Sequence, residues 1–135
     1  MLVVAFVIYL PTNRVAAQII PDVSASYSLL KTDLSIAEPI FVRFTVENRS
    51  TDKMVLDLGL NGYGNFRLKL VRPDGRTETA PKPQMLELGR SGAVSLDGLA
   101  SLDKLLLLNR WFNFDSVGRY TVDVEFTGQI GRAHV

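Results

Sequence analysis

Apolar and polar residues alternate most strictly near the C-terminal end of the chain, in residues 118–126. There the apolar side chains occupy every second position: Tyr120, Val122, Val124 and Phe126. A period of two over this length predicts a β-strand with one buried face, as in antiparallel sheets. Residues 40–47 alternate in the same way, and Pro39 stands at their entrance, where a missing amide donor does least harm.

Shorter segments of the same kind predict further strands. They are residues 23–31, 54–58, 65–72 and 76–79. Pro73-Asp74-Gly75 predicts the turn between the last two, because Pro presets φ and Gly accepts a positive φ. Together with the less regular regions, the chain holds about seven extended segments, and we expect an all-β fold.

Two regions are less regular. Residues 80–98 contain Pro81 and Pro83, which favour an extended edge segment, with a short strand around Leu86 and Leu88. Residues 100–108 have both helical spacing and a continuous apolar run. Periodicity cannot separate the two, and the antiparallel context favours a strand, or a short turn of helix followed by a strand.

The segment before the last strand predicts how that strand begins. Asp115-Ser-Val-Gly118-Arg-Tyr120 resembles the tyrosine corner of immunoglobulin-type sandwiches, in which a tyrosine hydroxyl bonds to the backbone upstream. We therefore expect Asp115, Gly118 and Tyr120 to form a structural corner. The expected fold is an immunoglobulin-like antiparallel β-sandwich, and Val122 stands where antibody domains carry a cysteine.

The N-terminal segment has the features of a secretion signal. An apolar block at residues 2–10 is too short to span a bilayer, and small residues precede Gln18. We expect a signal peptide at residues 1–17, cleaved near Ala17, and an extracytoplasmic protein, periplasmic or secreted. No Lys or Arg precedes the apolar block, so the alternative is a hydrophobic first strand.

The last six residues, Ile-Gly-Arg-Ala-His-Val, resemble the translation of a common short-read sequencing adapter. We expect residues 130–135 to be such an artefact, which removes His134 from consideration, and the domain to span residues 18–129. A natural polar tail is the alternative. One strand normally follows the tyrosine-corner strand. A chain cut at about residue 129 would lack it and expose an unpaired apolar edge.

Composition excludes several classes of function. With 15 Lys and Arg against 14 Asp and Glu, interspersed, neither nucleic-acid binding nor polybasic membrane binding is indicated, and no membrane contact is expected after signal cleavage. The absence of cysteine excludes disulfides, thiolate-bound zinc and thiol nucleophiles. The carboxylates are scattered over separate turns and strands: Asp33, Glu38, Glu47, Asp52 and Asp57. We expect no catalytic residues, no metal and no cofactor.

A few residues are candidates for partner contact. Tyr63 lies at the tip of a glycine-rich loop, and Phe112 is the member of the aromatic group Trp111, Phe112 and Phe114 expected to face outward. Trp111 and Phe114 are expected to cap the core. Asn48-Arg49-Ser50 matches a glycosylation acceptor, although Asn48 can equally bond its own backbone in a turn.

Several motifs carry a family resemblance. They are Leu34-Ser-Ile-Ala-Glu-Pro-Ile-Phe-Val, Glu47-Asn-Arg-Ser, Pro73-Asp-Gly, Leu108-Asn-Arg-Trp-Phe-Asn-Phe and Gly118-Arg-Tyr-Thr-Val. The chain resembles uncharacterised secreted bacterial immunoglobulin-like domains, and more weakly BsuPI-type proteinase inhibitors and macroglobulin-like modules. These motifs specify the fold well and an activity poorly, since sandwiches host many functions. Our first hypothesis is a non-catalytic extracytoplasmic interaction or structural domain that binds a protein or glycan. The alternatives are an accessory module of a larger secreted enzyme, such as a peptidase, and a proteinase inhibitor acting through residues 80–86.

Overall fold

The computed structural model describes residues 6–9, 14–15, 22–35, 37–59, 64–80, 92–128 and 130–132. In this part of the chain the regular structure is almost entirely strand, with one short 3-10 helix, η2 (Leu108–Arg110). The strands are β1 (Phe6–Tyr9), β2 (Arg14–Val15), β3 (Val23–Leu29), β4 (Asp33–Leu34), β5 (Phe41–Asn48), β6 (Met54–Asp57), β7 (Phe66–Val71), β8 (Thr77–Thr79), β9 (Ala93–Leu96), β10 (Ser101–Leu107), β11 (Gly118–Phe126) and β12 (Ile130–Arg132). No helix in the described residues is long and apolar enough to cross a membrane.

The strands form three sheets. Sheet A has the order β4-β1-β11-β7-β8, with β2 also pairing with β11; sheet B is β10-β5-β3; sheet C is β12-β6-β9. Sheets B and C are antiparallel throughout, as is the β11–β7 pair of sheet A. Only β1 and β2 run parallel to their neighbour, β11. The predicted all-β, antiparallel architecture is confirmed.

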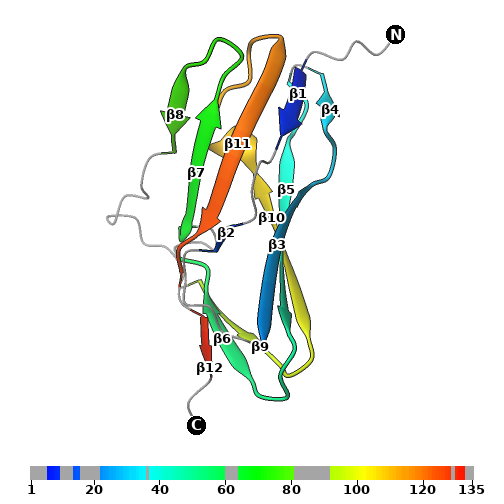
Figure 1. Ribbon diagram of the computed structural model, residues 1–135, viewed down its shortest axis with the longest axis vertical. Coiled ribbons are helices and arrows are strands. Elements are labelled where there is room, and N and C mark those ends of the chain that lie inside the picture. Colours follow the sequence, from blue (N-terminus) through cyan, green and yellow to red (C-terminus); the bar gives the residue numbers. More distant parts are fainter. Residues whose placement is uncertain are drawn as a thin grey trace.

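The sheets pack face to face in two layers. Figure 1 shows sheet A over the upper half of the molecule and sheet C over the lower half, with β5 and β10 of sheet B running past both. The Phe44 ring of β5 lies 5.0 Å from that of Phe66 and 5.2 Å from that of Phe126, which belong to the opposite layer. Aromatic side chains from both layers therefore meet in one core.

The period-two segments form the strands that the pattern predicts. Along β5 and β11 the residues at every second position are buried: Val42, Phe44, Val46, Tyr120, Val122, Val124 and Phe126. Within the ambiguous segment 100–108, residues 101–107 form the strand β10, and the helical turn η2, which starts at Leu108, comes after the strand rather than before it. Strand β9, at residues 93–96, was not predicted, whereas the strand expected at Leu86 and Leu88 lies outside the described residues.

The two ends differ from expectation in one respect. The predicted unpaired edge of β11 is wrong in this structure, because β7 pairs with one side of β11 while β1 and β2 pair with the other. β1 is the hydrophobic first strand of the alternative interpretation; the cleavage site near Ala17 lies outside the described residues and stays a prediction. Ile130 is buried in β12, which pairs with β6, and the adapter origin of residues 130–135 also stays a prediction.

Candidate functional site

The carboxylates and ligand-type side chains of the described residues do not gather into a chemical centre. No group of three or more His, Cys, Asp or Glu able to hold a metal ion occurs among them. Glu38, for example, bonds Lys31 at 2.6 Å and accepts the Ser35 N–H at 2.8 Å. The Lys31 bond, followed by the Ser35 bond, lowers the pKa of Glu38, so this carboxylate is an ionised partner in a local turn.

The tyrosine corner is present and closed by hydrogen bonds. The Tyr120 hydroxyl donates to the Ser116 carbonyl at 2.9 Å and accepts the Ser116 N–H at 3.1 Å. Gly118 has φ +139°, and a Cβ there would approach Pro73 to within 2.7 Å, so no larger residue fits without a shift. The predicted upstream bond of Tyr120 is confirmed, and its role is structural.

Arg72, which was not predicted from the sequence, completes this corner. Its guanidinium is nearly buried and lies 3.0 Å from Glu78, 3.3 Å from Asp115 and 2.7 Å from the Asn113 carbonyl. Burial opposes its charge, but the hydrogen bond and charge of Glu78 and the charge of Asp115 outweigh burial and raise the pKa of Arg72. Asp115 therefore ties the corner to the β7–β8 hairpin.

The two predicted contact residues do not form a site. The prediction that Phe112 faces outward is wrong: the side chain is only 6% exposed, and its ring packs edge-on against that of Phe114 at 6.4 Å. Trp111 is the half-buried member of the aromatic group. Tyr63 lies outside the described residues, as does most of the loop proposed for proteinase inhibition.

Asn48 is a buried polar anchor rather than an accessible glycosylation acceptor. It is 2% exposed, and its Nδ2 lies within hydrogen-bond distance of the carbonyls of Asp52, Leu96 and Asp97. Its Oδ1 accepts the N–H of Ser50 at 3.1 Å, so the predicted turn bond is confirmed. These bonds join the β5–β6 turn to the β9–β10 turn.

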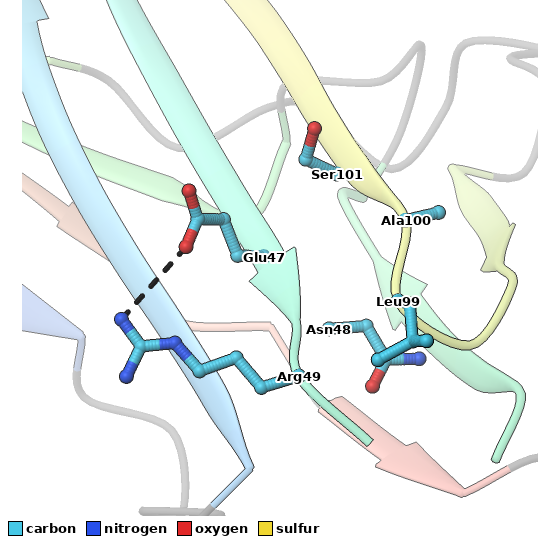
Figure 2. Close-up of a pocket in the computed structure, with 6 residues that line it drawn as sticks. All are labelled: Glu47, Asn48, Arg49, Leu99, Ala100 and Ser101. Atoms are coloured by element: carbon cyan, nitrogen blue, oxygen red, sulfur yellow. Dashed lines mark ion pairs between the residues drawn. The ribbon is translucent and has the colours of Figure 1, made fainter. Parts of the chain in front are cut away.

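A shallow hollow of about 320 Å³ lies beside those turns. Figure 2 shows the Arg49 side chain reaching back toward Glu47, while Leu99 stands on the neighbouring turn. The Arg49–Glu47 pair is long, at 3.8 Å, and exposed, so it contributes little to stability. Leu99 is 72% exposed with φ +64°. These groups offer no converging donors or acceptors that define a ligand.

The solvent-facing side of sheet B carries a more specific feature. Leu106 and Val42 are paired and buried, so their neighbours Leu107 and Phe41, also paired, point to the opposite side. Leu30, the residue after the end of β3, donates its N–H to the Phe41 carbonyl and extends this row on the other side of β5. Leu105 lies two positions along β10 on the same side.

We call this surface, with the adjoining Trp111, the apolar patch. Its residues are Leu30, Phe41, Leu105, Leu107 and Trp111. Leu30 and Leu105 are each 46% exposed. The helix η2 holds Trp111 beside the patch. Two hydrogen bonds fix η2 in place: Leu108 donates its N–H to the Ile40 carbonyl, and the side-chain oxygen of Asn109 accepts the Ile40 N–H.

Cationic side chains border the apolar patch. Arg43 is paired with Leu105 and therefore lies on the same face. Lys104 and Arg110 line a hollow of about 190 Å³ together with patch residues Phe41, Leu105, Leu107 and Trp111. Lys104 lies opposite Phe44 and therefore points to the core-facing side of the edge strand β10. An inward-pointing charge on an edge strand discourages pairing with another strand.

No protein-family model matches the chain, and no curated protein matches it at a significant level.

Proposed function

We propose that this chain is a non-catalytic interaction domain, extracytoplasmic, which binds a protein partner through the apolar patch. The observation that carries the proposal is the half-exposure of Leu30 and Leu105 on a sheet face whose opposite side is already packed into the core. Exposed apolar side chains that are contiguous and bordered by charge are typical of protein-interaction surfaces. Their position on a rigid sheet favours binding without rearrangement.

We further propose that the fold is an immunoglobulin-like sandwich. Two features support this. The chain crosses from β10 in one layer to β11 in the other through the tyrosine corner, as the strands flanking that corner do in such sandwiches. The two layers also share one aromatic core, in which the Phe44 ring packs against rings of the opposite layer.

Photo-crosslinking tests the proposed function. A photoreactive phenylalanine analogue is placed at Leu105 of the full chain, expressed in its source cells, and irradiated. The proposal predicts one discrete covalent protein product that disappears when Leu107→Asp is added. The control position is Ser26, which is exposed on β3 of the same sheet but outside the apolar patch. Equal crosslinking from Ser26, or none from Leu105, would overturn the proposal.

A further inference from the structure

The charges around the apolar patch have one predominant sign. Arg43 lies on the same face as the patch and Arg110 lines the hollow beside Trp111, whereas the carboxylate of Asp103 on that face accepts the Thr45 hydroxyl at 2.7 Å. Lys31, which follows Leu30 in the chain, is bonded to Glu38 at 2.6 Å. Two cations against one engaged carboxylate make the border of the patch positive, although the chain as a whole is nearly neutral, with a formal charge of +1.

One of these cations, Arg43, takes part in none of the ion pairs found among the described residues. Arg43 lies within reach of a ligand seated on the patch, because it is paired with Leu105, and Arg110 lines the same hollow as Trp111. A ligand that supplied carboxylates here would gain ion pairs next to apolar contacts, where lower solvent access strengthens them.

We propose that the apolar patch binds an acidic amphipathic segment of another protein. Its apolar side chains lie on Leu105, Leu107 and Phe41, and its carboxylates meet Arg43 and Arg110. This inference rests on the proposed function and specifies the chemistry of the partner. Charge complementarity favours this occupant over a second copy of the chain, because a two-fold contact between two such patches would bring their cations together.

The docking mode follows from the edge of the sheet. The inward-pointing Lys104 on β10 disfavours extension of sheet B by an added strand. The partner segment therefore lies on the face of the sheet, and its affinity comes from side chains rather than from backbone pairing.

Selection from a random displayed peptide library against the full chain tests the inference. Selected peptides are synthesised, and their binding is followed by the fluorescence of Trp111, the only tryptophan of the chain. We expect sequences rich in Asp, Glu and large apolar residues. Their affinity should fall about tenfold or more in Arg43→Glu and in Arg110→Glu, and should weaken as salt is added. Lys69→Glu, the same charge change on β7 in the other layer, is the matched control and should bind normally.

The possible failures are distinguishable. Peptides that require Leu105 but are neutral or basic, and indifferent to both charge reversals, would overturn the acidic partner while leaving the proposed function standing. A concentration-dependent dimer in sedimentation that Leu105→Asp dissociates would replace the partner by a second copy. Selected peptides that bind Leu105→Asp as tightly as the unaltered chain would overturn both proposals.

Discussion

The hydroxyl of Tyr27 accepts a hydrogen bond from the backbone N–H of Phe126 at 2.8 Å, from one layer of the molecule to the other. Tyr27 belongs to β3 and Phe126 is the last residue of β11, so the bond joins strands that are 99 positions apart in the chain. The Tyr27 ring lies 5.2 Å from that of Phe44, within the aromatic core. A buried amide that would otherwise lack a partner is thus satisfied across the core.

Tyr27→Phe tests this bond. The substitution keeps the ring but leaves the Phe126 N–H without its acceptor, so the free energy of unfolding should fall by about 1 to 3 kcal/mol. Urea unfolding of the full chain measures it. Ser26→Ala, at the exposed neighbouring position, is the control and should be nearly neutral. An unchanged midpoint for Tyr27→Phe would mean that the bond contributes nothing.

Stability should also depend on pH through the same side chain. Burial raises the pKa of Tyr27 to about 12; the Phe126 bond opposes the shift, and the charge of Glu125 adds to it. The unfolded chain ionises this phenol from about pH 10 while the folded chain keeps it neutral, so its contribution is complete below pH 10 and is lost as the pH rises toward 12.

The unfolding free energies of the unaltered chain and Tyr27→Phe, compared at about pH 9 and about pH 11, measure this dependence. The difference between them should shrink at the higher pH, because the phenylalanine variant has no proton to lose. A difference that stays constant across the interval would contradict the assignment.

Tyr120→Phe should weaken the corner. It removes a bond donated to the Ser116 carbonyl and a bond accepted from the Ser116 N–H, and we expect a loss of about 1 to 3 kcal/mol in unfolding free energy. Ser116→Ala is a sharp control, because both bonds use backbone atoms that the substitution keeps. Equal losses for the two variants in thermal or urea unfolding would show that the corner is not held by the hydroxyl.

Two substitutions of Asn48 should lower the free energy of unfolding to different extents, one by removing hydrogen bonds and the other by adding a buried charge. Asn48→Ala leaves the carbonyls of Asp52, Leu96 and Asp97 without this donor and should cost about 1 to 3 kcal/mol. Asn48→Asp should cost more at neutral pH, because it directs a carboxylate at the same oxygens. Asn113→Ala, at an exposed position, is the control. Urea unfolding in which the aspartate variant is the milder one would contradict this geometry.

The strands were predictable where burial is one-sided. In β5 and β11 each inward position is apolar, and the period of two places the core without knowledge of the partner strands. β9 escaped prediction because its burial pattern alternates in only four residues, Ala93–Leu96, with a single fully buried side chain. The order of β10 and η2 was likewise ambiguous, since a run of leucines fits both periods.

The apolar patch was harder to predict, because it depends on register between distant strands. The sequence contains Leu105 and Leu107 next to the buried Leu106, but only the pairing with Phe41 and Arg43 shows which leucines face solvent together. The available signal was the run of four leucines at 105–108, since a strand cannot bury all of them on one face. The prediction for Phe112 failed because it also depends on tertiary packing: the Phe112 ring packs against that of Phe114 instead of facing outward.

The proposed binding surface requires that Leu105 faces solvent while its neighbour Leu106 belongs to the core. The measurement is the difference in unfolding free energy between Leu105→Asp and Leu106→Asp. We predict that Leu105→Asp changes stability by no more than about 0.5 kcal/mol, whereas Leu106→Asp, which buries a charge, costs at least about 4 kcal/mol or prevents folding. Similar large losses for both variants would place Leu105 in the core and contradict the proposed binding surface.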